Sequence, residues 1–205
     1  MVIKMDENLK FKVSMLGDSG VGKSSIILRK TNNSFSEETS ATVGTTTAKI
    51  TEDIGEALID LLIWDTAGQE KFHSLSPFYI SNSNAIIFVY AVNDDVSFQS
   101  IDKWYDIARN NLNTVDPYFI LVANKNDLIN EENAITYEKG KNKADSLQMD
   151  FLSVSAKLND DIDLIVQIIA QNIFKKTQKK EAATETNSVH LINDQNNANE
   201  KKSCC

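Results

Sequence analysis

Short apolar runs alternate with longer segments of helical periodicity between about Leu9 and Phe174. This alternation predicts strands and helices that wind into a mostly parallel sheet. The runs IIFVYAV and FILVA are almost continuous, which is typical of central strands covered on both faces. Strands are expected at Phe11–Leu16, Ala57–Trp64, Ala85–Ala91, Phe119–Ala123 and Phe151–Val154.

Helical periodicity fills the segments between these runs. Helices are expected after the loop at Gly22, around Ser97–Asn110, around Tyr137–Leu147 and from Asp161 to Lys176. One face of the helix at Ser97–Asn110 carries Phe98, Ile101, Trp104 and Ala108. We interpret that stripe as core packing, because large apolar side chains are usually buried.

Composition predicts one folded domain with a tail, since 41% of the 205 residues are hydrophobic. We expect a short extension at residues 1–8, a folded domain at residues 9–177 and a flexible tail at residues 178–205, where large apolar residues are few. The net charge of −8 argues against nucleic acid as a partner, which needs a basic face. Apolar runs are too short for a membrane span or a signal peptide, so we expect a protein of the cytosolic side.

Residues 17–24 read GDSGVGKS, between the apolar run FKVSML and the apolar helix SSIILRK. That context separates a phosphate-binding loop from a chance match. Glycines allow a phosphate to approach the backbone closely, and the next helix presents its positive end. We expect Lys23 to bridge the outer phosphates and the Ser24 hydroxyl to bind Mg²⁺. The expected phosphate-binding residues are Asp18, Ser19, Gly20, Val21, Gly22, Lys23, Ser24 and Ser25.

A second motif, WDTAGQE at residues 64–70, leaves an apolar strand with Asp65 at its carboxyl end, where parallel sheets bind ligands. We expect Asp65 to hold Mg²⁺ through water, the Gly68 amide to contact the terminal phosphate and Gln69 to orient the attacking water. Taken alone, Asp65 could instead cap a helix. The phosphate loop upstream favours the magnesium role.

Two further motifs, NKND at residues 124–127 and SAK at residues 155–157, follow the apolar runs FILVA and FLSV. Asp127 can accept hydrogen bonds from the ring nitrogen and the exocyclic amine of guanine, a donor pair that adenine lacks. Lys125 can lie along the base, and Ala156 can offer its amide to the guanine oxygen. NKND alone could be a surface turn. The expected nucleotide-binding residues of these two motifs are Asn124, Lys125, Asp127, Ser155, Ala156 and Lys157.

In this order the motifs resemble the Ras superfamily of small GTPases, most of all its Rab branch, over about Leu9 to Lys176. The resemblance implies an α/β P-loop NTPase fold with a six-stranded, mostly parallel sheet and helices on both faces. It also implies that Phe35 packs on the guanine and that Thr42 contacts Mg²⁺ and the terminal phosphate. Gln69, Lys23 and Thr42 are then the residues expected to serve hydrolysis.

Two segments depart from the usual Rab pattern, although Trp64 and Tyr79 match two of the three aromatic residues that Rab effectors touch. VGTTT at residues 43–47 replaces a segment like IGVDF, so Thr47 stands where Rabs have phenylalanine. YISN at residues 79–82 replaces YYRG and removes an arginine. Aromatic and arginine side chains dominate binding hot spots, so this divergent Rab-like chain should differ in its partners.

The only cysteines, Cys204 and Cys205, are the last two residues. The resemblance implies that both carry geranylgeranyl groups, as in Rabs ending in CC, and this ending differs from the C-a-a-X signal. Two lipid chains satisfy the rule that stable anchoring takes two signals. The expected location is therefore the cytoplasmic side of an intracellular membrane, in exchange with the cytosol.

The expected function is a monomeric GTP/GDP switch that regulates vesicle-mediated transport and needs Mg²⁺. Hydrolysis should be slow, on the order of 10⁻⁴ to 10⁻² per second, because no arginine finger is evident. Implied partners are an exchange factor, an activating protein, a GDP-dissociation inhibitor or escort protein, and effectors at switch I (residues 35–46) and switch II (residues 67–81). The alternatives are a Ras- or Rho-like signalling GTPase and a GTP-binding scaffold with negligible hydrolysis.

Overall fold

The computed structural model describes residues 8–37, 45–66, 76–114 and 116–179. The chain divides into two compact units, Met1–Ala170 and Gln171–Cys205. The sheet and the helices discussed below belong to the first unit, and residues 162–179 are helical.

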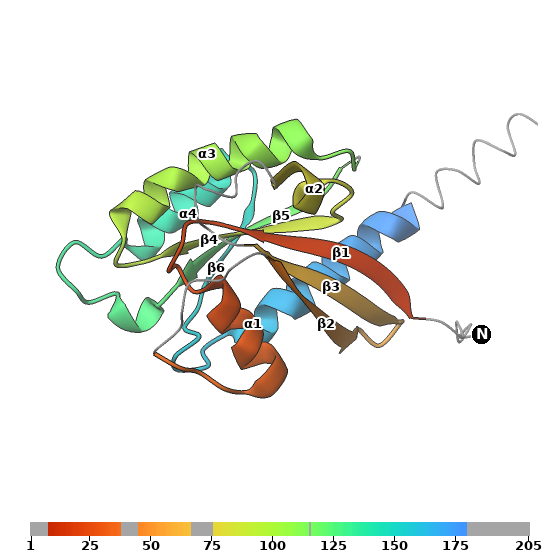
Figure 1. Ribbon diagram of the computed structural model, residues 1–205, viewed down its shortest axis with the longest axis horizontal. Coiled ribbons are helices and arrows are strands. Elements are labelled where there is room, and N and C mark those ends of the chain that lie inside the picture. Colours follow the sequence, from red (N-terminus) through yellow and green to blue (C-terminus); the bar gives the residue numbers. More distant parts are fainter. Residues whose placement is uncertain (1–7, 38–44, 67–75, 115, 180–205) are drawn as a thin grey trace, which may run out of the picture. The chain divides into compact units, whose positions relative to one another are not determined.

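A six-stranded sheet in the order β2-β3-β1-β4-β5-β6 forms the centre of the first unit (Figure 1). Its strands are β1 (Leu9–Leu16), β2 (Thr45–Asp53), β3 (Leu58–Thr66), β4 (Ala85–Ala91), β5 (Tyr118–Asn124) and β6 (Asp150–Ser153). Only the β2–β3 pairing is antiparallel, so the predicted six-stranded, mostly parallel sheet is confirmed.

The edge strand β2 was not among the strands expected from apolar runs. Its sequence, TTTAKITED, contributes one hydrophobic residue, Ile50, to the buried core as far as the strand is described. A strand with one solvated face alternates polar and apolar positions and needs no apolar run. β2 is therefore defined as a strand by its antiparallel pairing with β3. In this pairing Thr47 lies opposite Trp64, and Ile50 lies opposite Leu61.

Helices lie on both faces of the sheet, as expected: α3 and α4 lie on one face and α1 on the other (Figure 1). The helices are α1 (Lys23–Asn32), α2 (Ser76–Ile80), α3 (Asp95–Asn111) and α4 (Tyr137–Ser146). The apolar stripe of α3 is buried against the sheet in one hydrophobic cluster with strands β4 and β5, as predicted. Asp94 caps α3 by accepting a hydrogen bond from the Ser97 amide.

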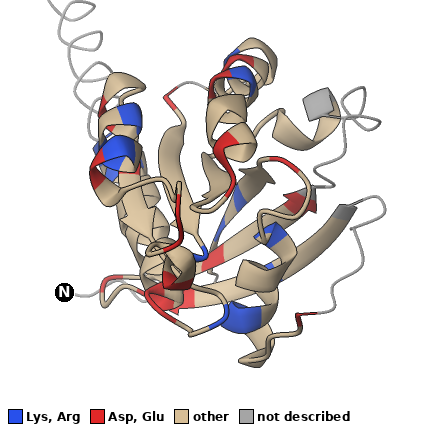
Figure 2. Cartoon of the chain, turned by 90° about the vertical axis from the view of Figure 1, so that its left-hand side faces the viewer, with Lys and Arg blue, Asp and Glu red and all other residues tan. Residues whose placement is uncertain are grey.

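Charged residues of both signs are interspersed over the described helices and loops in the view of Figure 2. A buried charge is found at Asp60 on β3, which is only 1% exposed. Its carboxylate accepts hydrogen bonds from Asn8 Nδ2 at 3.0 Å and Thr51 Oγ1 at 2.7 Å. It also pairs with Lys49 Nζ at 2.9 Å. Asp60 therefore joins β3 to β2 and to the residue that precedes β1.

Asp60 should make folding stability depend on pH in acid. Burial by itself raises the pKa of Asp60, but the hydrogen bonds from Lys49, Thr51 and Asn8 outweigh it and lower the pKa from 3.8 to about 2. A pKa that is lower in the folded state stabilises the fold above the unfolded value, and this contribution is lost as pH falls from about 4 to 2. Water around the exposed Lys49 screens this interaction, so we expect Asp60 to contribute about 1–2 kcal/mol to the free energy of unfolding.

The measurement is urea unfolding of wild type, Asp60→Asn and the exposed control Glu56→Gln between pH 5 and 2.5. Asp60→Asn should be less stable at pH 5, and its stability should fall less steeply with acid. An unchanged slope in Asp60→Asn would contradict the role given to this carboxylate.

Candidate functional site

The predicted motifs meet at the edge of the sheet where the parallel strands end. β1 leads into residues 17–24, β3 ends at Thr66, β5 ends at Asn124, and β6 precedes residues 155–157. Because β3 and β4 lie on opposite sides of β1, the chain leaves the central strands in opposite directions at this edge. Such a point in an open α/β sheet is where ligands bind.

The phosphate loop, residues 17–24, is pressed closely against neighbouring segments. A Cβ atom at Gly17, where φ is +147°, would lie 2.2 Å from the Val89 carbonyl oxygen. A Cβ atom at Gly22, where φ is +95°, would lie 2.3 Å from Asn124 Nδ2. Both positions therefore require glycine. Among the described residues no side chain caps α1 at Gly22, so the positive end of that helix faces the loop.

Lys23 is buried inside this loop, with 5% of its surface exposed. Its ammonium donates to the carbonyl oxygens of Gly17 and Asp18, both at 2.8 Å. Burial lowers the pKa of Lys23 to about 8, although the charges of Asp65 and Asp18 act in the opposite direction. A cation held at the carbonyls of an anion-binding loop can contact a phosphate there.

Ser24 and Asp65 form the part of the site that fits a magnesium ion. The Ser24 hydroxyl donates to Asp65 Oδ2 at 2.5 Å. Asp65 is 4% exposed, and its Oδ1 has no hydrogen-bond partner among the described residues. Burial raises the pKa of Asp65, against the effects of the Ser24 hydrogen bond and the Lys23 charge. A hydrated cation would satisfy this carboxylate oxygen, and oxygen ligands are those that Mg²⁺ prefers.

Asn124 joins the phosphate loop to the expected base-binding loop. Its Nδ2 donates to the Val21 carbonyl at 2.8 Å, and its Oδ1 accepts from the Ala156 amide at 3.2 Å. The side chain is buried, and both its amide nitrogen and its carbonyl oxygen have a hydrogen-bond partner. The expected contact between the Ala156 amide and guanine stays a prediction.

Asp127 is oriented by Ser155, whose hydroxyl donates to Asp127 Oδ1 at 2.5 Å. The same hydroxyl accepts from the Leu158 amide at 3.0 Å. Lys125 adopts a left-handed conformation, with φ of 64°, at the turn that leads into Asp127. A carboxylate held by one oxygen presents a defined face to a ligand, as guanine recognition requires.

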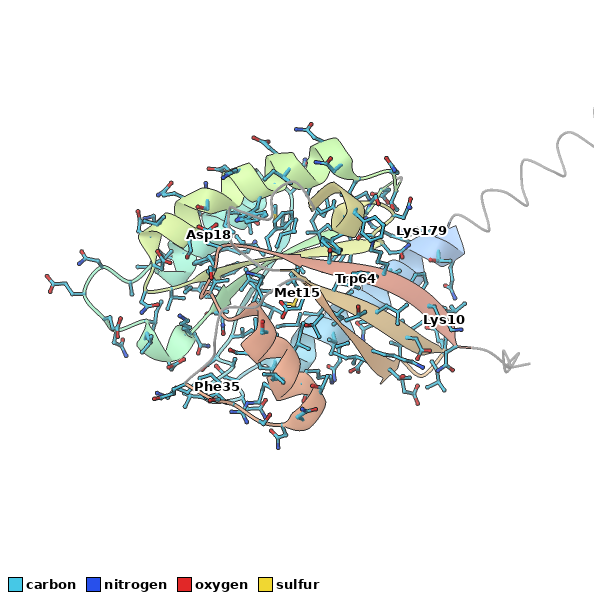
Figure 3. The ribbon with its side chains drawn as sticks, viewed as in Figure 1. Lys10, Met15, Asp18, Phe35, Trp64 and Lys179 are labelled. Carbon is cyan, nitrogen blue, oxygen red and sulfur yellow. The ribbon has the colours of Figure 1, made fainter. Side chains whose placement is uncertain are left out.

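The remaining predicted residues fall into three groups. Ser19, Gly20 and Val21 lie in the loop between β1 and α1, and Ser25 lies in the first turn of α1. Asp18 and Phe35 both lie in the left half of Figure 3. Lys157 forms an ion pair with Glu37 at 2.8 Å. Thr42, Gly68, Gln69, Cys204 and Cys205 lie outside the described residues.

Trp104 is a residue of this region that the sequence pattern assigned only to the core. It is 2% exposed, and its Nε1 donates to Asp18 Oδ1 in the phosphate loop at 2.8 Å. The residue type could have indicated this contact, because a buried indole N–H needs a hydrogen-bond partner and an apolar stripe does not supply one. α3 therefore supports the phosphate loop as well as the core.

Comparison with known proteins points to one family. Residues 12–175 match the Ras family. The Ras-related protein RabC of Dictyostelium discoideum is 33% identical, over 98% of this chain and 100% of its own. The Ras-related protein Rab-17 of Homo sapiens is 34% identical, over 89% of this chain and 85% of its own. The GTP-binding protein ypt2 of Schizosaccharomyces pombe is 33% identical, over 95% of both chains.

Trp104→Phe should weaken nucleotide retention, because it keeps an aromatic ring in the core and removes the N–H that holds Asp18. We expect a fluorescent GDP analogue to dissociate about tenfold faster, as is typical for the loss of a hydrogen bond to a charged group. Stopped-flow measurement with excess unlabelled GDP gives the rate.

The matched control is Tyr105→Phe, on the same helix, where the ring packs against Phe88 and Phe119. Equal dissociation rates in Trp104→Phe and Tyr105→Phe would show that Trp104 serves the core alone.

Proposed function

The chain belongs to the Ras family of small GTPases. We propose that it works as a Rab-like switch, through residues that bind nucleotide and magnesium and through two terminal cysteines that attach it to a membrane. It is a Rab-like GTPase that binds guanine nucleotide and hydrolyses GTP to GDP and phosphate. Regulation of vesicle transport is the general role of Rab proteins. The Rab relatives favour this role over that of a Ras- or Rho-like signalling GTPase.

One observation carries the assignment of the site. The buried Asn124 carboxamide holds the phosphate loop on one side and the loop of residues 155–157 on the other. A ligand with phosphates at one end and a base at the other could reach both loops. We assign the base end to guanine, because Asp127 can pair with both guanine donors and would remain unpaired against adenine.

Each residue has a separate task in the proposed site. Lys23 holds the outer phosphates, and Phe35 covers the base. Ser24 and Asp65, with Thr42, would hold Mg²⁺, which neutralises charge that develops on the phosphate oxygens. Asp65 Oδ1, which has no hydrogen-bond partner within the described part of the chain, supports that assignment. Gln69 orients the attacking water in this proposal, by resemblance to the family.

Regulators and effectors are general to this family, and we propose that effectors here contact the aromatic residues next to switch II. The Trp64 and Tyr79 rings lie 5.8 Å apart, and Lys12 Nζ lies 5.0 Å from the Trp64 ring. Phe78 packs edge-on against Tyr79 and is 69% exposed. Exposed aromatic side chains support a protein-binding role. Thr47, opposite Trp64, offers no aromatic ring.

For the membrane, we propose geranylgeranyl groups on Cys204 and Cys205, with recycling by an inhibitor or escort protein. Within the described part of the chain, no helix is long and apolar enough to cross a bilayer. Two lipid chains would give stable yet extractable anchoring. We also propose that the protein is a monomer and that an exchange factor and an activating protein regulate it.

The proposed chemistry is tested by single-turnover hydrolysis of GTP and ATP by the purified protein with Mg²⁺. GTP should be hydrolysed slowly, on the order of 10⁻⁴ to 10⁻² per second, and ATP should not be bound. Gln69→Leu should lower the GTP rate roughly tenfold or more while binding persists.

The control is Gln167→Leu, which changes an exposed glutamine on the helix of residues 162–179. Normal turnover in Gln69→Leu would remove Gln69 from the mechanism. Tight GTP binding by wild type without turnover would instead favour the scaffold.

The membrane proposal predicts that Cys204→Ser/Cys205→Ser moves the protein from the membrane to the soluble fraction of cells, since both lipid chains are lost. Each single variant should bind less firmly, because one chain gives only marginal anchoring. Cell fractionation with mass spectrometry of the tail is the measurement. Lys201→Ser/Lys202→Ser is the control for electrostatic attraction. Membrane retention of the double cysteine variant would contradict lipid anchoring.

A further inference from the structure

Arg29, on α1, contacts the loop that follows β6 through two hydrogen bonds. Its Nε donates to the Ala156 carbonyl oxygen at 2.8 Å, and its Nη2 donates to the Lys157 carbonyl oxygen at 3.0 Å. These are carbonyls of consecutive residues in the expected base-binding loop. The planar guanidinium with its fixed donors suits two neighbouring carbonyls, whereas an ammonium is a single point donor.

The same guanidinium also holds the chain where it leaves α1 toward Phe35. Nη1 donates to the Asn33 carbonyl oxygen at 3.1 Å and lies 3.4 Å from Asn33 Oδ1. The Asn33 amide in turn donates to the Arg29 carbonyl at 3.0 Å, and Asn33 has a left-handed φ of 49°. Arg29 Cζ lies 5.9 Å from the centre of the Phe35 ring, within the range of a cation–π contact. One side chain therefore contacts both the turn after α1 and the aromatic ring beyond it.

The base-binding loop is consequently held from two directions. Asn124 Oδ1 accepts from the Ala156 amide on one side, and Arg29 donates to the Ala156 carbonyl on the other. The exposed ion pair between Lys157 and Glu37 adds a weaker link between this loop and the segment that contains Phe35. Arg29 is the half-buried centre of these connections.

We propose that Arg29 is a positioning residue for guanine, which sets the loop of residues 155–157 and the Phe35 ring at the spacing that the base requires. It acts through Ala156, Lys157 and Phe35. The inference rests on the proposed assignment of those residues to guanine. Small displacements of a binding loop cost affinity, because polar groups built to pair with the ligand are then imperfectly paired. Loss of Arg29 should therefore reduce base recognition more than phosphate binding.

The test compares GDP with ADP, because the two ligands share their phosphates and ribose and differ only in the base. Inhibition constants are measured in competition with a fluorescent GDP analogue for wild type and Arg29→Met, which keeps the apolar stem of the side chain. The ratio of the ADP constant to the GDP constant should fall about tenfold in Arg29→Met. Arg29→Lys should show an intermediate loss, since lysine can reach one carbonyl at a time.

The matched control is Lys30→Met at the next position, where the ammonium pairs with Glu52 and Asp163 rather than with the base-binding loop. This variant should keep the wild-type ratio. In combination with Asp127→Asn, Arg29→Met should cost less than the sum of the two single effects, because both act on base recognition.

A wild-type ratio in Arg29→Lys and Arg29→Met would overturn the inference, as would equal losses of GDP and ADP binding, which indicate a purely structural role. If Arg29→Met does not fold, the ratio in Arg29→Lys decides. Absence of guanine preference in the wild type would instead refute the proposed base site itself, so the two failures are distinguishable.

Discussion

The buried carboxamide of Asn124 joins the two halves of the candidate site. It donates to the phosphate loop at Val21 and accepts from the base-binding loop at Ala156. Its position depends on Gly22, because any side chain there would meet Nδ2 at 2.3 Å. A buried amide with both ends paired is costly to disturb, since each lost partner leaves a desolvated polar group. The spacing between the phosphate loop and the loop of residues 155–157 therefore depends on one hydrogen-bonded side chain and on the absence of a Cβ atom at Gly22.

Two buried clusters at β3 show how the surroundings decide what a charge does. Asp60 is fully engaged with Lys49, Thr51 and Asn8, and its pKa is lowered, so it stabilises the sheet. Asp65, five positions further along the same strand, has one engaged oxygen and one without a described partner, and burial raises its pKa. Buried charge without compensation is unfavourable. A hydrated cation at the site would offset that cost, which is why the second cluster suits a ligand and the first suits the fold.

Helices on both faces of the sheet support the loops at its carboxyl edge. Trp104 on α3 reaches the phosphate loop through Asp18, and Arg29 on α1 reaches the loop after β6. Trp104 also packs in the hydrophobic core, so positioning and packing are not separate properties of that side chain. By contrast, the Phe78 ring is exposed and Trp64 is half-buried, and Thr47, opposite Trp64, offers no aromatic ring. The contacts of Trp104 and Arg29 therefore support the loops of the candidate nucleotide site.

The sequence by itself determined the parallel strands and the positions of the motifs, because apolar runs report burial and the motifs directly follow those runs. It also predicted which residues would hold phosphate, magnesium and guanine, since those roles depend on residue chemistry and short spacing. Tertiary structure alone decided that β2 is a strand, that Trp104 pairs with Asp18 and that Arg29 contacts Ala156. The last two contacts join residues separated by 86 and 127 positions. Local periodicity carries no information about such pairs, because their geometry arises only when the sheet brings distant loops to one edge.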